Sequence, residues 1–320
     1  MLPLLRAVCR PLLPPGENLS RVRHEVLKYE PGKRSVIAYE LYAGAALPCA
    51  RVIGKLYRND RGRAMYDNLL NLWQASERPA AQRKLTAERA AAAENGLAFA
   101  MPQPLAYLSD LGMVLQRAAP GRLLAGVTDG EELFLAMQHV AKNLAALHGL
   151  PLPHLARKSL EDHLQKYCHP GPQALVEALP EYGPLVNAGL RLMAEGGLAE
   201  TPVCPVHGDL NLAQIFITAD RAYFIDFDGM CLAHAALDAG NFLATLKVHF
   251  GAKAEELRHV FLETYLAHAP LALEGLRTYQ AFAYFRRALI HFRRQTEADW
   301  RTKMEHGLKT SLALLQEAAA

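Results

Sequence analysis

The side chains best suited to chemistry lie between residues 206 and 230, in the segment VHGDLNLAQIFITADRAYFIDFDGM. His207 and Asp209 form an H-x-D pair, an amide follows at Gln214, and two short β-rich stretches joined by a turn end at Asp226. A strand–turn–strand unit brings its two ends together, so we expect Asp209, Gln214 and Asp226 to converge on one small volume. Two carboxylates and an amide oxygen are hard ligands, which suit Mg²⁺.

Phosphoryl transfer is a reaction that needs such a cluster. One acid orients or deprotonates the attacking hydroxyl, while another carboxylate and an amide hold the metal that neutralises the phosphates. An H-G-D triplet alone arises readily in turns. Its combination with I-D-F-D on a second short strand is what favours a catalytic interpretation of Asp209 and Asp226.

The first hundred residues contain the elements of a small β-rich lobe. Three β-rich stretches at 23–29, 35–42 and 51–57, separated by turns, predict an antiparallel meander. Helical patterns follow at 63–74 and 80–95, and residues 105–117 predict a hairpin that ends in a strand. Pro120-Gly121 then ends the β-rich pattern.

After that break the pattern is mostly helical. The S/T-x-x-E form of 128–131 predicts a capping box that opens a helix over 131–148. Further helices are predicted at 160–167, 184–194, 254–268, 278–294 and 302–317, with the short β-stretches 214–218 and 222–226 among them. We therefore predict an α+β chain with two lobes, a small β-rich one over 1–117 and a larger, mostly helical one over 118–320.

Composition excludes several classes of protein. The 320 residues include 35 basic and 32 acidic ones, and a net charge of +3 is too balanced for a dedicated nucleic-acid binder. The five cysteines are scattered and never form a C-x-x-C pair, which argues against a disulfide framework or a zinc site. No uncharged apolar run is both long enough and free of proline to cross a bilayer. We expect a cytoplasmic protein without membrane or nucleic-acid partners, present as a monomer or homodimer.

The pattern H-G-D-L-x-x-x-[N/Q] followed by I-D-F-D resembles the catalytic and metal-binding loops of the aminoglycoside phosphotransferase and choline kinase-like families. These are small-molecule kinases with a bilobal protein-kinase-like fold. The resemblance implies that Asp209 is the catalytic acid that receives or positions the proton of the substrate hydroxyl. It also implies that Gln214 and Asp226 are Mg²⁺ ligands, that His207 is a scaffold residue, and that Asp238 ties down the catalytic loop.

The same resemblance implies an ATP site. Lys55 in the third strand would bind phosphates, residues 31–34 would form the nucleotide loop, and backbone groups near Gln116 and Ala118 would meet adenine. Glu88 is the acid predicted to pair with Lys55. The nearer helix over 63–74 offers only Asp67 for that pairing.

These features together predict an ATP- and Mg²⁺-dependent transfer of the γ-phosphoryl group to a hydroxyl of a small molecule, such as a sugar, an amino alcohol or an aminoglycoside-like acceptor. The alternative is a nucleotide-binding regulator on the same fold, because Gln214 replaces the common asparagine and the nucleotide loop has a single glycine. A kinase acting on proteins is disfavoured, because the chain runs quickly from Asp226 to Asp238 without an activation segment.

A basic stretch in the C-terminal half bears on the acceptor. Its arginines are Arg286, Arg287, Arg293 and Arg294. A solvated helix face is the ordinary interpretation of such a run. If part of that face lines the acceptor pocket, the pocket favours a neutral or anionic acceptor over a polycationic one.

Overall fold

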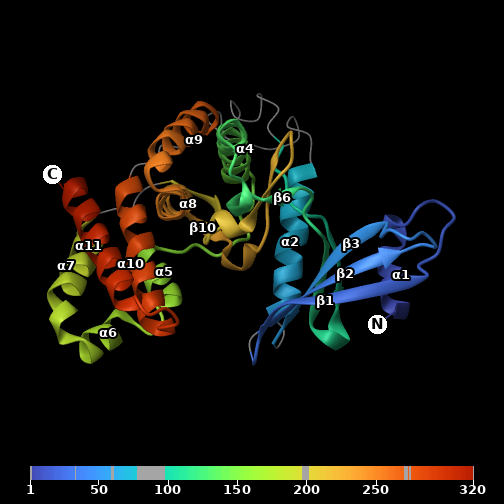
Figure 1. Ribbon diagram of the computed structural model, residues 1–320, viewed down its shortest axis with the longest axis horizontal. Coiled ribbons are helices and arrows are strands. Elements are labelled where there is room, and N and C mark those ends of the chain that lie inside the picture. The colour runs from blue at the N-terminus through green and yellow to red at the C-terminus, as the bar shows by residue number, and fades with distance from the viewer. Residues whose placement is uncertain are drawn as a thin grey trace.

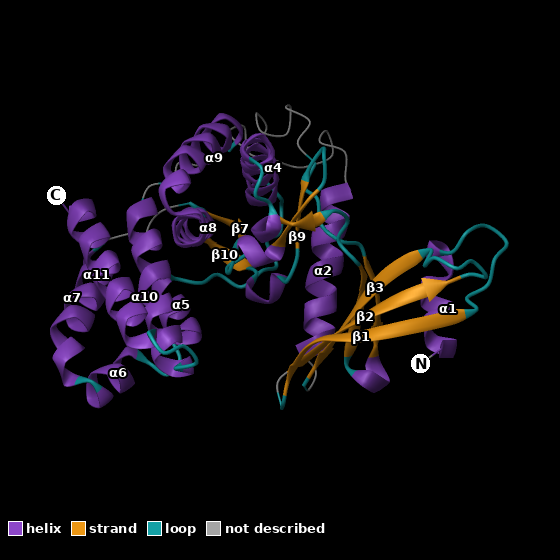
Figure 2. Cartoon of the chain, in the orientation of Figure 1, coloured by secondary structure: helices purple, strands orange, loops and turns teal. Residues whose placement is uncertain are grey.

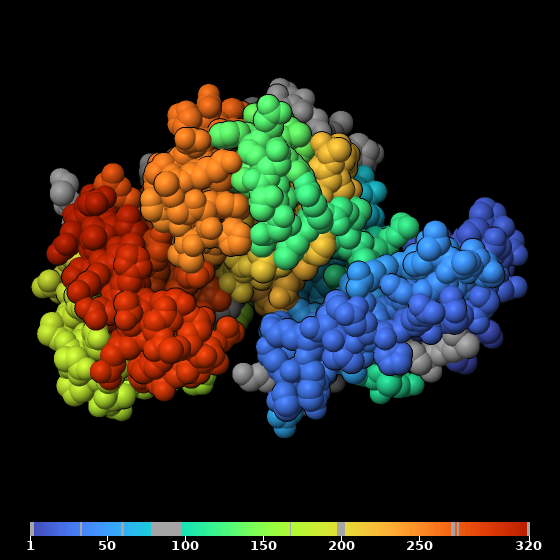
Figure 3. All heavy atoms as spheres, in the orientation of Figure 1, coloured from blue at the N-terminus to red at the C-terminus, as the bar shows by residue number. Residues whose placement is uncertain are grey.

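The computed structural model describes residues 2–32, 34–58, 61–77, 98–196, 202–269, 273 and 275–319. Figure 1 shows a strand-rich N-terminal part on one side and a cluster of helices on the other, with α2 (Arg61–Glu77) and α4 (Gly130–His148) between them. The space-filling view in Figure 3 is hollowed where the N-terminal strands face the C-terminal helices. The predicted bilobal α+β fold is therefore confirmed.

The N-terminal lobe is built on a five-stranded antiparallel sheet with the order β1-β2-β3-β5-β4. The strands are β1 (Arg21–Glu30), β2 (Arg34–Tyr42), β3 (Ala50–Tyr57), β4 (Pro104–Leu108) and β5 (Met113–Arg117). Successive β5 residues point to opposite faces, as the pleat requires. Met113 and Leu115 pack with α1 (Leu2–Cys9) on one face, whereas Val114 packs toward α2 on the other (Figure 2).

The C-terminal lobe is mostly helical. Its remaining helices are α5 (Leu160–Tyr167), α6 (Pro172–Ala178), α7 (Gly183–Glu195), α8 (Ala236–Phe250), α9 (Ala254–His268), α10 (Leu276–Arg294) and α11 (Trp300–Ala319). Helix α8 is buried along most of its length because it packs against both α9 and α10. No helix among those that the structure describes has the length and apolar character needed to cross a membrane.

Two short antiparallel ladders support the segment that carries the chemistry. In one, β7 (Val203–Val206) pairs with β10 (Cys231–His234). In the other, β8 (Ile215–Ile217) lies between β6 (Arg122–Leu123) and β9 (Ala222–Phe224). The H-G-D turn follows β7, and the I-D-F-D motif follows β9, so both motifs emerge at the ends of short strands.

Two packed clusters fill most of the interior. The central core joins residues of the N-terminal lobe such as Tyr57, Leu69 and Val114 to residues of the C-terminal lobe such as Leu144 and Phe242. The distal core joins β7 and β10 to α7, α10 and α11. The central core thus crosses from one lobe to the other, whereas a smaller buried cluster that includes Leu115 lies within the N-terminal lobe, between the sheet and α1.

The structure corrects some details of the elements predicted. The cap of α4 is Asp129, whose carboxylate accepts the N–H of Glu132 at 2.9 Å, and not Thr128. The sequence patterns also missed α1, α6 and the β7–β10 ladder, which are short and carry little periodicity. The helix predicted over 80–95 lies outside the described residues.

Candidate active site

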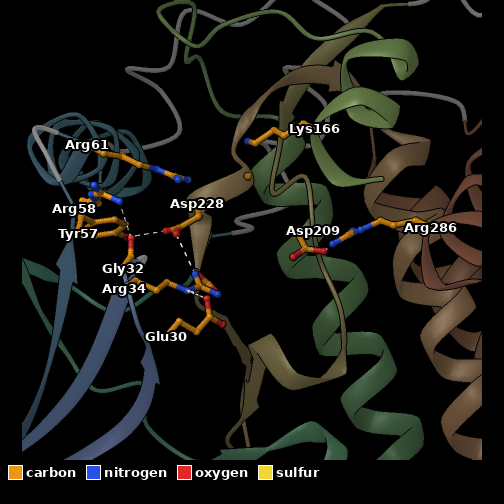
Figure 4. A pocket seen from close by; sticks show the side chains of 12 residues that line it. Glu30, Gly32, Arg34, Tyr57, Arg58, Arg61, Lys166, Asp209, Asp228 and Arg286 are labelled. Atoms are coloured by element: carbon orange, nitrogen blue, oxygen red, sulfur yellow. Dashed lines mark hydrogen bonds and ion pairs between the residues drawn. The ribbon is translucent and has the colours of Figure 1, made fainter. Parts of the chain in front are cut away.

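The side chains that could do chemistry gather in a cleft of about 600 Å³ between the lobes. Figure 4 shows them projecting from the β1–β2 turn, β3, α2, α5, the two motif loops and α10. They are Glu30, Gly32, Arg34, Tyr57, Arg58, Arg61, Lys166, Asp209, Asp226, Asp228, Gly229 and Arg286. Asp209 and Asp226, which were predicted from the sequence to converge, therefore line the same cleft.

The loop that carries Asp209 is fixed by a buried carboxylate. Asp238 is fully buried at the start of α8, and its two oxygens accept the N–H groups of His207 at 2.6 Å and Gly208 at 2.8 Å. Burial alone would raise the pKa of Asp238, but the hydrogen bond and charge of His148 and the N–H of His207 hold that pKa below its usual value. Asp238 thus holds the turn before Asp209 as an anion, which agrees with the structural role that the resemblance implies.

His207 connects the two motif loops. Its Nε2 lies 2.8 Å from the carbonyl oxygen of Ile225, and its ring lies against Phe227 with the ring centroids 4.8 Å apart. The residue after it, Gly208, has a φ of +80°, and a Cβ there would meet the carbonyl oxygen of Gly229 at 2.4 Å. The H-G-D turn and the I-D-F-D segment are consequently in direct contact, as a scaffold role for His207 requires.

Asp226 and Asp228 share cations from the N-terminal lobe. The ammonium of Lys55, on β3, forms ion pairs with both carboxylates, and its distance to Oδ1 of Asp228 is 2.6 Å. Nη1 of Arg34, at the start of β2, lies 3.2 Å from Asp228 and 3.7 Å from Asp226. Burial alone would raise the pKa of Asp226, but the charges of Lys55 and Arg34 lower it. Asp226 is therefore held as an anion, and both carboxylates are paired with two cations from the other lobe.

Tyr57 completes this cluster. Its hydroxyl donates to Oδ1 of Asp228 at 2.7 Å. Burial and the negative charge of Asp228 raise the pKa of Tyr57. Tyr57 therefore remains a protonated donor and helps to hold the carboxylate of Asp228 in place.

Gln214, the third residue expected to converge with Asp209 and Asp226, is not among the residues that line the cleft. The side chain is buried, and its amide oxygen accepts the N–H of Asn211 at 3.2 Å. Its main-chain carbonyl accepts the N–H of Ile225, the residue before Asp226, at 3.0 Å. The backbone of Gln214 is thus tied to the acid segment, while its amide group caps the turn over Leu212–Gln214.

Asp209 has an arginine partner from the C-terminal half of the chain. Nη1 of Arg286, on α10, lies 2.6 Å from Oδ1 of Asp209. Figure 4 shows the two side chains pointing toward each other within the cleft. Arg293, by contrast, is exposed and donates to the carbonyl of His169 at 2.8 Å. One arginine of the basic stretch, Arg286, therefore lies in the cleft.

The structure describes the residues predicted to contact adenine, but only one of the two acids considered as partners of Lys55. Gln116 lies in β5 opposite Ile53 of β3. The N–H of Ala118 donates to the carbonyl of Arg51 at 3.0 Å, so that N–H is engaged by the sheet. Glu88 lies outside the described residues. Asp67 pairs with Arg63 on the same helix.

From the sequence, Arg34 is predicted to lie in the nucleotide loop and Arg286 in a basic stretch, but their carboxylate partners are not predicted, and no role is predicted for Tyr57 or Asp228. Asp228 could have been found, because it is the second acid of the I-D-F-D motif. The other three have no such signal. Their positions depend on how β2, β3 and α10 pack around the motif loops.

Asp226 and Asp228 are the donor set best suited to a divalent cation. Both carboxylates reach the single ammonium of Lys55, so a cation between them can contact both. Among the residues that the structure describes, no group of three or more His, Cys, Asp and Glu side chains could hold a metal ion. Mg²⁺ commonly takes one or two carboxylates and completes its shell with substrate phosphates and water, so these two acids fit it.

Known structures share this architecture. A choline kinase from Cryptosporidium parvum Iowa II is similar with a TM-score of 0.63 at 13% identity, over 98% of this chain and 95% of that one. A thermostable mutant of aminoglycoside phosphotransferase APH(4)-Ia is similar with a TM-score of 0.62 at 13% identity, over 95% and 96% of the two chains. The choline kinase LicA from Streptococcus pneumoniae has a TM-score of 0.58 at 16% identity, over 97% and 98%. At these identities the likeness establishes the protein-kinase-like fold.

Comparison at the level of sequence gives a complementary result. No curated protein matches the chain significantly. The model of the phosphotransferase enzyme family matches residues 47–290, a range that includes Lys55, both motif loops and most of α10. Because this match covers most of the 320 residues, the chain belongs to the phosphotransferase enzyme family.

Proposed function

We propose that this protein is an ATP- and Mg²⁺-dependent kinase that transfers the γ-phosphoryl group to a hydroxyl of a small molecule. One observation carries the proposal. Lys55 of one lobe is paired with Asp226 and Asp228 of the other, in the same cleft as Asp209. Similar structures contain ADP, among them an aminoglycoside phosphotransferase APH(2'')-Ib. This likeness supports the use of a nucleotide.

In the proposed reaction the acceptor hydroxyl lies against the carboxylate of Asp209. The hydroxyl oxygen forms a bond to the γ-phosphorus while the bond from that phosphorus to the β–γ bridging oxygen breaks, and ADP leaves. The hydroxyl proton passes to the carboxylate of Asp209 and then to solvent. The protein contributes mainly the alignment of the two substrates and preset positive charge, as this chemistry requires.

Cations on the nucleotide side would bind the phosphates. Lys55 and Arg34 would exchange their present carboxylate partners for phosphate oxygens when ATP enters. Backbone groups near Gln116 and Ala118 would meet adenine, and since the N–H of Ala118 is engaged by Arg51, its carbonyl is the group we expect to take part. Glu88 would pair with Lys55 in that state.

Asp226 and Gln214 are the proposed metal ligands, and the geometry adds Asp228 to them. The amide oxygen of Gln214 would have to exchange the N–H of Asn211 for the ion, whereas the carboxylate of Asp228 already faces the cleft. Mg²⁺, when bound, would neutralise charge on the phosphate oxygens.

The test is turnover with an acceptor panel of sugars, amino alcohols, aminoglycosides and nucleosides, measured as ADP release. Asp209→Asn keeps the shape of the side chain but removes its basic oxygen, so we expect the rate to fall by about 10² to 10⁴. Asp220→Asn is the matched control, because Asp220 is exposed and pairs with Arg221 at the far end of the β8–β9 hairpin. Chelation of Mg²⁺ with EDTA should stop the reaction of the unchanged protein.

Two results would contradict the proposal. ATP binding without turnover across the whole panel would favour a nucleotide-binding regulator. Equal rates for Asp209→Asn and Asp220→Asn would remove Asp209 from the reaction.

A further inference from the structure

A second cavity of about 470 Å³ opens beside the cleft. It lies between the start of α2, the loop over 154–158 and the segment after β9, and it shares Arg61, Lys166 and Asp228 with the cleft. A ligand of modest size can therefore extend from Asp209 into this second cavity, which the proposed reaction does not use.

Positive charge dominates this cavity. Arg61 comes from α2, Lys158 from the loop before α5, and Lys166 from the last turn of α5. The carboxylate in its wall, Asp228, is already engaged by Lys55, Arg34 and Tyr57. In the described part of the chain, no carboxylate lies within ion-pair distance of Arg61 or Lys158.

The three cations act on one another. Figure 4 shows Arg61 and Lys166 directed toward each other from opposite sides of the cleft. Desolvation and the neighbouring charge of Lys158, with a further contribution from Arg61, lower the pKa of Lys166 to about 8. Like charges gathered in this way are costly in the ligand-free protein, and an anion between them would offset that cost.

The cations of the second cavity are different residues from those expected to bind the nucleotide. Lys55 and Arg34, on the sheet of the N-terminal lobe, are the cations placed to receive the phosphates of ATP. Arg286 adds positive charge beside Asp209, where the acceptor hydroxyl must lie. A polycationic acceptor would be repelled from both ends of this region.

We infer that the phosphoryl acceptor is a hydroxyl compound that also carries an anionic group, which is held by Arg61, Lys158 and Lys166 while its hydroxyl meets Asp209. This inference rests on the proposed function. The anionic group takes no part in the bond changes, which are those given above for the hydroxyl and the γ-phosphorus. A phosphate monoester matches three cations better than a carboxylate does, so a phosphorylated alcohol is the expected acceptor.

The first test is binding and needs no turnover. Inorganic phosphate is titrated into the full chain in the presence of saturating ADP and Mg²⁺, by calorimetry. Arg61→Gln and Lys158→Gln should each weaken phosphate binding by about tenfold or more, because each removes one of the three cations. Arg63→Gln is the matched control, since Arg63 lies on the same helix, pairs with Asp67 and lines neither cavity. Loss of phosphate binding when ADP is added would assign these cations to the nucleotide and overturn the inference.

The second test is turnover with acceptors of related carbon skeleton that differ in charge: glycerol, glycerate and glycerol 3-phosphate, and glucose, gluconate and glucose 6-phosphate. We expect the anionic members to have at least tenfold higher kcat/KM, and the Arg61→Gln and Lys158→Gln variants to raise the KM for the acceptor with the KM for ATP unchanged. Preference for neutral or cationic acceptors, unaltered in these variants, would overturn the inference and leave the proposed function intact. Absence of turnover with every acceptor, including the wider panel above, would overturn the proposed function and the acceptor assignment with it, even if the variants lost phosphate binding.

Discussion

Gly208 lies where the H-G-D turn touches the segment after β9, and only glycine fits there. Its φ of +80° is strained for residues with a side chain, and an added Cβ would lie 2.4 Å from the carbonyl oxygen of Gly229. The same residue donates its N–H to Asp238 at 2.8 Å. One position therefore sets the distance between the two motif loops and their anchorage to α8.

Replacing Gly208 by alanine should lower the free energy of unfolding by about 2 to 4 kcal/mol, because the backbone must move against both the strain and the contact. Urea denaturation of the variant measures this loss. Gly126→Ala is the control, since Gly126 has open space around it and no positive φ, and a change within about 0.5 kcal/mol is expected there. Equal losses in the two variants would show that the loop contact is not the cause.

At the scale of elements, α5 is the helix whose packing depends most clearly on pH. Its His163 is 1% exposed, lies 3.7 Å from the sulfur of Cys231, and packs edge-on against Phe282 of α10. Desolvation, helped by the nearby charge of Lys158, lowers the pKa of His163 to about 4. The helix is thus packed around a neutral imidazole.

The sign of the pH dependence follows from this shift. An unfolded histidine titrates near 6.5, so between pH 6.5 and 4 the unfolded chain binds the proton and the folded chain does not. Stability is fully present above pH 6.5 and should fall by up to about 3 kcal/mol as the pH approaches 4. His163→Gln should reduce the difference between urea midpoints measured at pH 7 and pH 4.5. His259→Gln is the control, because His259 is 81% exposed, and a similar reduction in that variant would contradict the assignment to His163.

The elements also show what sequence reasoning could and could not reach. The helix predicted over 254–268 matches α9 to the residue. A helix of this length repeats its apolar spacing over several turns, so its pattern in the sequence is clear. The strand β7 was missed because four residues that include Pro205 carry no alternation. Among the site residues, Asp209 and Asp226 were accessible from a local motif. The pairing of Arg34 with Asp228 was not, because it joins residues 194 positions apart and depends on how the lobes meet.

At the scale of the whole molecule, the central core connects the two lobes, and we expect it to make their unfolding cooperative. It joins Leu69 and Leu72 of α2 to Phe242 and Leu243 of α8, and α8 also contributes Ala236 and Leu237 to the distal core. Packing is therefore continuous from the N-terminal lobe to α11. We expect both lobes and the distal helices to lose structure together.

The two tryptophans of the chain provide the test. Trp73 of α2 packs on the central core and Trp300 of α11 on the distal core. In the variants Trp300→Phe and Trp73→Phe, the fluorescence of the remaining tryptophan should follow the far-UV circular dichroism of the same sample through one urea transition. A fluorescence midpoint for Trp300 well below the dichroism midpoint would show that the distal helices unfold by themselves.

The H-G-D turn lies at the seam between the two cores, since Val206 before it belongs to the distal core and Leu210 after it to the central core. Lys166 and Arg286, on the proposed acceptor side, are carried by helices that pack on the distal core, whereas Phe224 and Phe227 around Asp226 pack in the central one. Arg61, on the opposite side of the proposed anion site, lies on α2, which packs in the central core, so the cations proposed to hold the acceptor come from both packing units. A shift of one core against the other would therefore change the separation between Arg61 and Lys166, and with it the size of the anionic group that fits between them.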